Sequence, residues 1–301
     1  MSRKKPSARA PFSPAASAAR HPLARAGVWI ALGWVAALSG VAYGLSLLPD
    51  HVRNSASAPT RLEWIAPPAW LAGPDWAHIL TDLERQIDLH PNSDIYDPIV
   101  CEFVGVHLAR SPWIERVRRV AKQHDGRVRV EVDFRKPFTF IEFDGRAYLV
   151  DVEGVRLPPA IPAESVDSEQ WLSIRRPAAP PPPVGERWPG SDVAAGITLV
   201  RYIYTAEEQG TAAYRSSLKA VDVGNYNYRE RSGDGWLKLI TRNPRSYIHW
   251  GLPPGEEYGI ESTAATKLGA LTSLYARYGA FPDAGPIDIR GDDGILIGGG
   301  H

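Results

Sequence analysis

The sequence predicts an α+β protein with a single transmembrane helix near its N-terminus. The prediction rests on three patterns: one long uncharged apolar run, apolar residues at helical spacing in several later segments, and strict alternation of apolar and charged residues between them. After the transmembrane helix we expect a first domain with the order strand, helix, helix, strands. A mostly antiparallel β-domain with a C-terminal helix is expected to follow.

The apolar run covers residues 26–48 and contains no charged residue. As an α-helix its 23 residues span about 34 Å, enough for a hydrocarbon core of about 30 Å. Six basic residues and no acidic residue precede it, so the positive-inside rule places the N-terminus in the cytoplasm. A cleavable signal peptide, with small residues at 56–58, is the alternative. Its apolar core would be only about 7–15 residues long.

Charge balance and cysteine content exclude some classes of function. Six of the 34 basic residues precede the apolar run, so 28 basic and 34 acidic residues follow it. The exported part is mildly acidic, and nucleic-acid binding, which uses a basic face, is not expected. Cys101 is the single cysteine, so neither an internal disulfide nor a thiolate metal cluster can form.

Two helices are expected early in the exported part, after a short strand at residues 62–65. Within residues 76–87 apolar side chains recur at i, i+3, i+4, i+7 and i+11, which is the pattern of an amphipathic helix. A second helix is expected over residues 99–108, because Asp97 is a good N-cap and Pro98 suits the first helical turn.

The clearest pattern is a β-hairpin. Residues 128–134 alternate valine or phenylalanine with charged residues, and a turn at 125–126 separates them from a strand at 114–122. Alternation puts one face of this hairpin in the core and the other in solvent. Two further strands, at 138–143 and 147–150, are expected to complete the first domain.

Three short motifs in this region are informative together. They read SPWI at 111–114, RKP at 135–137 and YLVDVEGV at 148–155. In this order, and after an N-terminal anchor, they resemble the POTRA domain of the FtsQ/DivIB family of bacterial cell-division proteins. Phe134 stands where that family most often has glutamate.

A proline-rich stretch at residues 158–190 follows, with a run of four prolines at 180–183. We expect an extended, polyproline-like connection between two domains. A ligand for a proline-binding module is the alternative interpretation, but a stiff linker needs the same composition.

The second domain is expected to begin with a helix at residues 192–204. An antiparallel meander should follow between residues 218 and 250. Helical spacing returns from residue 262, with Ala265, Leu268, Leu271 and Leu274 on the apolar face, and Gly279 is placed to end that helix. Short strands at 286–290 and 294–297 are expected to close the chain.

The end of the chain extends the resemblance. Residues 287–294 read IDIRGDDG and are followed by ILIG, which is similar to the strand after the C-terminal helix of the FtsQ/DivIB β-domain. Gly291 stands where the family often has tyrosine. The resemblance covers nearly all residues from 26 to 298.

No pattern in the sequence indicates catalysis. The chain lacks GxSxG, P-loop, dinucleotide-binding and HExxH motifs. Adjacent acids, as at 207–208 and 256–257, do not define the two-carboxylate geometry of glycoside hydrolysis. We therefore expect no catalytic site, no cofactor, no metal ligand and no small-molecule substrate.

The resemblance implies a non-enzymatic, single-pass scaffold of the divisome, in the inner membrane at the division septum. Its partners would be FtsB/FtsL-type bitopic division proteins, bound through the C-terminal β-domain. The alternative is a POTRA-bearing component of envelope transport or assembly. An enzyme acting on cell-wall glycan is a third possibility, which lacks every catalytic motif above.

We expect the partner to bind at the last strand of the chain. Residues 294–298 read GILIG, which leaves an apolar side chain on each face of a strand expected at a sheet edge. An open apolar edge can pair with a strand of a partner. Coverage by a loop or helix of the same chain is the alternative. The expected partner-binding residues are Arg290, Asp292, Gly294, Ile295, Leu296 and Ile297.

Seven segments are thus expected. They are a disordered basic cytoplasmic tail (1–25), a transmembrane anchor (26–48), a linker (49–60), a POTRA domain (61–157), a proline-rich connection (158–190), an FtsQ-type β-domain (191–298) and a short tail (299–301).

Membrane topology is directly testable. A phosphatase that is active only outside the cytoplasm should be active when fused after His301, because the basic N-terminal flank keeps the other end inside. The same enzyme fused before Met1 serves as the control and should be inactive. An inactive C-terminal fusion combined with an active N-terminal fusion would reverse the predicted orientation.

Overall fold

The computed structural model describes residues 22–55, 61–87, 99–123, 125–231, 236–279, 281, 285–291 and 296–297. Most of the expected N-terminal tail, the end of the linker, the expected cap at Asp97 and Pro98 and the C-terminal tail lie outside these residues. The chain forms two compact units, Met1–Pro59 and Thr60–His301.

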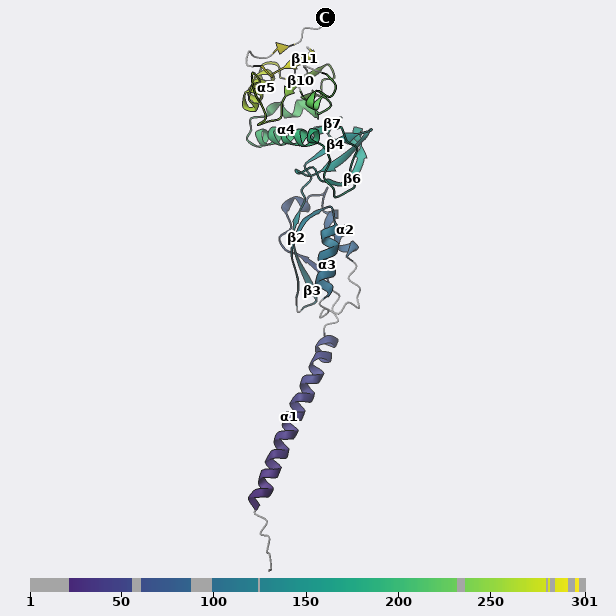
Figure 1. Cartoon of the computed structure of the whole chain (residues 1–301), viewed down its shortest axis with the longest axis vertical. Helices are drawn as coiled ribbons and strands as arrows, with labels where there is room; N and C mark the ends of the chain where they lie inside the picture. The colour runs from purple at the N-terminus through teal and green to yellow at the C-terminus, as the bar shows by residue number, and fades with distance from the viewer. Residues whose placement is uncertain are drawn as a thin grey trace, which may run out of the picture. The chain divides into compact units, whose positions relative to one another are not determined.

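The described part of the first unit is one helix, α1 (Pro22–Ser55), drawn in purple in Figure 1. Its stretch Trp29–Leu47 is long and apolar enough to cross a membrane. The predicted N-terminal apolar helix is therefore confirmed. It extends beyond the expected residues 26–48 at both ends.

The second unit begins with a three-stranded sheet in the order β1-β3-β2. Its strands are β1 (Arg61–Trp64), β2 (Ile114–Lys122) and β3 (Arg127–Phe134). Strand β1 runs parallel to β3, whereas β2 is antiparallel to it. Between β1 and β2 the chain forms helices α2 (His78–Gln86) and α3 (Ile99–Arg110).

Helix α3 packs on this sheet through apolar side chains of both elements. Val128 and Val130 of β3 are fully buried and share a core with Val104 and Leu108 of α3. Two β-bulges interrupt the pairing of β2, so its inward-facing residues Ile114, Val117 and Val120 are three positions apart. The bulges explain why the sequence of β2 lacks the two-residue alternation of an ordinary strand.

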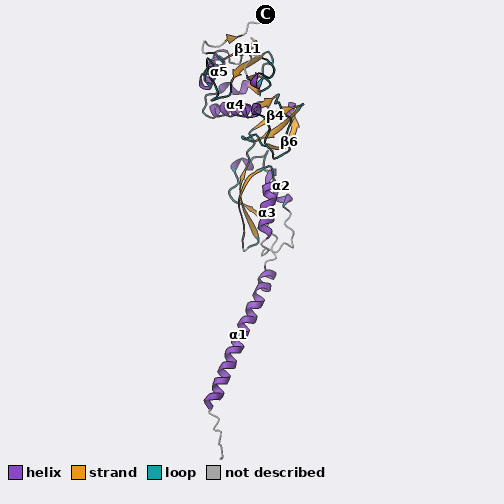
Figure 2. Cartoon of the chain, in the orientation of Figure 1, coloured by secondary structure: helices purple, strands orange, loops and turns teal. Residues whose placement is uncertain are grey.

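Nine strands form the larger sheet, in the order β12-β11-β10-β9-β8-β7-β4-β5-β6. Figure 2 draws the strands in orange and labels β4, β6 and β11 among them. They are β4 (Thr139–Phe143), β5 (Arg146–Val150), β6 (Arg156–Pro162), β7 (Ser173–Arg175), β8 (Leu218–Asp222), β9 (Leu237–Thr241), β10 (Ser246–Gly251), β11 (Gly285–Asp288) and β12 (Leu296–Ile297). The pairs β4–β7, β7–β8 and β10–β11 are parallel and the others antiparallel. Coarsely, the prediction of an α+β protein is confirmed.

In the described part of the chain, four short 3-10 helices lie between these elements. They are η1 (Ala69–Ala72), η2 (Ala163–Ser165), η3 (Ala213–Ser217) and η4 (Tyr226–Tyr228).

The expected boundaries at residues 157 and 190 need correction. Strands β4 and β5, expected in the first domain, belong to the nine-stranded sheet, because β4 pairs with β7. The proline-rich residues 158–190 are not a linker either. They supply most of β6, all of β7 and the buried side chain of Trp188. The chain therefore passes from the three-stranded sheet to the nine-stranded sheet between β3 and β4.

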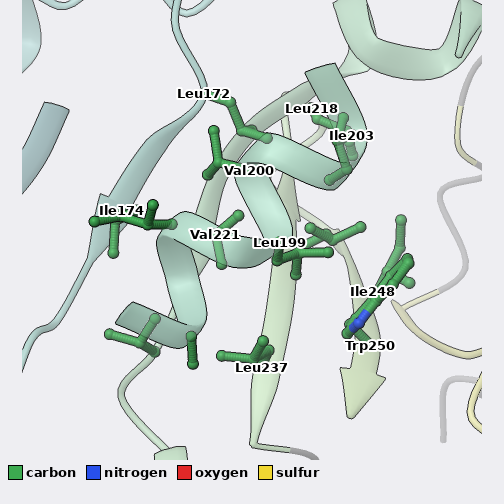
Figure 3. Close-up of a cluster of buried hydrophobic side chains, with 14 of the residues drawn as sticks. Leu172, Ile174, Leu199, Val200, Ile203, Leu218, Val221, Leu237, Ile248 and Trp250 are labelled. Carbon is green, nitrogen blue, oxygen red and sulfur yellow. The ribbon is translucent and has the colours of Figure 1, made fainter. Parts of the chain in front are cut away.

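Helix α4 (Ser191–Glu208) forms the centre of the largest core. Figure 3 shows its residues Leu199, Val200 and Ile203 facing apolar side chains of the sheet. Gly196 permits this close approach, since a Cβ there would lie 3.0 Å from Val223 and 3.1 Å from Ile174. The helix thus packs directly on β7 and the end of β8.

Helix α5 (Ala264–Tyr278) is bounded by clear local signals. Thr263 caps its N-terminus by accepting a hydrogen bond from the N–H of Thr266, and Gly279 ends it with a φ of 69°. The buried residues of α5 are Ala264, Lys267, Leu271 and Leu274, whereas Ala265, expected on the apolar face, is exposed. Position 267 is therefore a buried lysine.

The register of β3 predicts how two neighbouring substitutions differ. Val130→Asp should unfold the unit, because a buried unpaired carboxylate costs several kcal/mol of a stability of about 5–15 kcal/mol. Arg129→Ala is the matched control. It removes only an exposed ion pair with Glu63 at 3.1 Å, and should change the free energy of unfolding by less than about 1 kcal/mol. Equal shifts in melting temperature would show that the register is wrong.

Candidate partner-binding edge

Strand β12 lies at one end of the nine-stranded sheet. Its Ile297 pairs with Ile287 of β11 and its Leu296 pairs with Asp288. Among the strands that the structure describes, β12 has no neighbour on its other side. An outward row of backbone N–H and C=O groups of this kind is where a further strand can pair.

The opposite edge of the sheet, β6, is already blocked. It contains Pro158, Pro159 and Pro162, which have no N–H to donate to a further strand. At Arg156 the chain itself covers the edge, because its N–H donates to the carbonyl of Glu186 and its carbonyl accepts from the N–H of Gly185. The two ends of the sheet therefore differ in their capacity to accept a partner.

The structure places three of the six predicted binding residues at the β12 edge. Leu296 and Ile297 form β12, and Arg290 follows β11 by two residues. Asp292, Gly294 and Ile295 lie outside the described residues.

Arg290 is held by the carboxylate of Asp288. Its Nη2 and Nε lie 2.6 Å and 2.9 Å from Asp288 Oδ2 and Oδ1, and its backbone N–H also donates to Oδ1. Burial alone would raise the pKa of Asp288, but the hydrogen bonds and the charge of Arg290 outweigh it and lower that pKa below its ordinary value. The carboxylate therefore stays ionised at neutral pH and orients the guanidinium beside the edge.

A buried ion pair fixes the chain behind this edge. Lys267 Nζ, on a fully buried side chain, lies 2.6 Å from Glu261 Oε1 and 5.2 Å from the ring centroid of Trp250. The same Oε1 accepts the N–H of Leu252 at 2.6 Å. Room for this carboxylate exists because residue 251 is glycine, where a Cβ would collide with it.

The same segment also reaches the end of β11 through its backbone. Glu261 forms an isolated antiparallel bridge with Gly291, and the N–H of Ser262 donates to the carbonyl of Arg290 at 2.7 Å. Glu261 thus connects α5, the end of β10 and the residues after β11.

Sequence reasoning missed Glu261 and Lys267. A signal was present, because Ala264, Lys267, Leu271 and Leu274 follow one another at spacings of three and four on a single helix face. Placing the apolar face on Ala265 and Leu268 instead left Lys267 on the solvent side. Nothing local identifies Glu261 as its partner.

A second polar feature brings the three quoted motifs together. Arg135 Nη1 lies 2.7 Å from Asp151 Oδ2, with the two side chains 17% and 5% exposed. Asp151 Oδ1 also accepts the N–H groups of Glu153 and Val155, while the N–H of Arg135 donates to the carbonyl of Trp113. Arg135 therefore links the three segments, to residue 151 through the ion pair and to residue 113 through its backbone.

A cavity of about 520 Å³ adjoins this ion pair. Its lining includes the rings of Phe134, Phe138, Trp171 and Tyr204 together with several charged side chains. Burial raises the pKa of Tyr204, whose hydroxyl accepts the N–H of Leu172 at 2.8 Å, so this phenol is neutral. Within the described ranges, no group of three or more His, Cys, Asp or Glu is placed to hold a metal ion.

Lys267→Met tests the ion pair behind the edge. The change leaves the Glu261 carboxylate buried without its counter-charge, which should lower the free energy of unfolding by about 3–5 kcal/mol. Lys267→Met combined with Glu261→Gln should recover most of that loss. Arg85→Met, which breaks an exposed pair with Asp82 at 2.9 Å, is the control and should cost less than about 1 kcal/mol. Chemical denaturation gives the change in the free energy of unfolding for all three variants, and equal losses for Lys267→Met and Arg85→Met would contradict the assignment.

The chain was also compared with known proteins. No protein-family model matches it, and no curated protein does. Its function is therefore inferred from the geometry and motifs described above.

Proposed function

We propose that the chain is a non-enzymatic, single-pass scaffold of the bacterial divisome. In this proposal α1 anchors it in the inner membrane with the N-terminus in the cytoplasm. The exported part binds FtsB/FtsL-type bitopic division proteins, one of which adds a strand to β12. The observation that carries the proposal is the position of β12 at an edge of the nine-stranded sheet.

The architecture supports the family assignment behind this proposal. The order β1-α2-α3-β2-β3, with β1 parallel to β3, is compatible with a POTRA domain. A helix that precedes the last two strands, as α5 does here, is compatible with an FtsQ-type β-domain. Arg135 contacts both Asp151 and the backbone of Trp113, so the three motifs lie together in the fold. This contact is a physical reason why they occur in the same chain.

Strand addition suits the residues available at β12. Backbone pairing supplies affinity through N–H and C=O groups and makes little demand on side chains. A bitopic partner is confined to the same membrane, so its effective concentration at the edge is high. A short edge can therefore give stable assembly.

Two other edges among the described strands, β2 and β6, are poorer candidates. Strand β2 places Arg116, Arg118 and Arg119 in exposed positions and carries two bulges, features that discourage strand pairing. Strand β6 is blocked by its prolines. Of these three edges, β12 is the one without such protection in its described residues.

Deletion of residues 295–301 tests the proposal. It removes β12, so the full-length chain in detergent should lose co-purification with the co-expressed FtsB/FtsL-type pair of the same organism. Deletion of residues 299–301 leaves β12 in place and should retain wild-type recovery. Leu296→Glu should also abolish recovery without changing the melting temperature. Wild-type recovery of the pair by both the 295–301 deletion and Leu296→Glu would place the site elsewhere.

Localisation tests the cellular part of the proposal. A fluorescent fusion of the full chain should form a band at midcell. An even peripheral signal would instead favour an envelope transport component.

A further inference from the structure

The turn before α5 exposes two large apolar side chains. Ile260 is 90% exposed and Tyr258 is 68% exposed, the two highest values for large apolar residues in the described chain outside α1. Single exposed apolar residues are ordinary on protein surfaces. Two of them on one four-residue turn, both more exposed than any other outside the anchor, call for a physical reason.

The turn that presents them is firmly held. The N–H of Glu261 donates to the carbonyl of Tyr258 at 3.4 Å, and Gly259 between them has a φ of 70°, which favours glycine. Glu261 is fixed in turn by Lys267 and by the N–H of Leu252. Tyr258 and Ile260 thus lie on a turn whose backbone is held in place by hydrogen bonds, so little backbone entropy would be lost if a partner covered them.

Backbone pairing locates this turn relative to β12. The N–H of Ile289 points towards β10, where it donates to the carbonyl of His249. The carbonyl of Arg290, at a bend two residues after β11, accepts from the N–H of Ser262 on the segment that carries the turn.

Glu261 and β12 both pair with the chain at or just after the end of β11. Leu296 lies opposite Asp288, and Glu261 lies opposite Gly291 three residues further along the same chain. Three residues span at most about 10 Å, because an extended chain rises by about 3.3 Å per residue. An extended partner segment of roughly seven residues would span both.

We propose that Tyr258 and Ile260 form an apolar extension of the β12 edge. The strand that the partner adds to β12 continues past Gly291, and an aromatic or branched aliphatic side chain of that strand covers Ile260 and Tyr258. This inference rests on the proposed function, because it takes β12 as the site of strand addition. Contact with Tyr258 and Ile260 would add a specificity for the partner's side chains that backbone pairing alone does not supply.

The residue at position 291 agrees with this division of roles. Gly291 offers no side chain to a partner, so apolar contact near the end of β11 has to come from a neighbouring segment. Glu261 pairs with Gly291, which brings the turn carrying Tyr258 and Ile260 to that place. Both exposed residues are therefore available where the strand itself offers none.

Affinity for the FtsB/FtsL-type pair of the same organism tests the inference, with full-length proteins in detergent. The double variant Tyr258→Ser, Ile260→Ser should bind at least tenfold more weakly than wild type, because two exposed apolar contacts are lost. The control Tyr278→Ser, Ile99→Ser removes the same residue types at positions 47% and 62% exposed, and should bind within twofold of wild type. A double variant within twofold of wild type overturns the inference.

Two further measurements keep the outcome decisive. If the double variant melts lower than wild type, p-benzoylphenylalanine at position 260 decides: a photo-crosslink to the partner supports the inference, and its absence overturns it. The deletion of residues 295–301 separates the two proposals. Loss of binding on that deletion with an unaffected double variant rejects this inference alone, whereas unchanged binding on that deletion rejects the proposed function as well.

Discussion

The carboxylate of Glu261 is the contact on which the proposed binding edge depends. This carboxylate accepts hydrogen bonds from the ammonium of Lys267 on α5 and from the N–H of Leu252 after β10. The backbone of Glu261 also forms a bridge with Gly291 after β11. Breaking a buried ion pair is costly, whereas replacing both partners by apolar residues is often neutral. We therefore interpret the pair as a device that fixes the position of three elements more than as a source of net stability.

The two ends of the nine-stranded sheet differ in their protection. Prolines in β6 and the backbone around Arg156 close one end, while β12 at the other end has no neighbouring strand among the described residues. An unprotected edge is a liability for a freely diffusing protein, because it pairs with any available strand. Under the proposed function, in which α1 anchors the chain beside a confined partner, the same edge is a specific binding site.

Local sequence determined the elements whose stability is decided by their own residues. An uncharged run gave α1, because no acidic or basic residue interrupts the 19 mostly apolar positions from Trp29 to Leu47. Two-residue alternation put Val128 and Val130 in the core, since neighbouring side chains of a strand point to opposite faces. Thr263 and Gly279 bounded α5 through their capping chemistry. The sequence also indicated the last strand as an edge, from its place in the chain order.

Tertiary structure decided what depends on residues distant in sequence. Strand β4 joins the larger sheet because it pairs with β7, and no local pattern distinguishes that pairing from membership of the first sheet. Bulges in β2 shift its inward residues to a three-residue spacing, which defeats a search for alternation. The burial of Lys267 required a carboxylate six residues earlier and a glycine at 251 to admit it. The spacing along α5 could have indicated that Lys267 is buried, but no local pattern identifies its partner Glu261. The free energy that favours such pairings arises only once the segments meet in the folded chain.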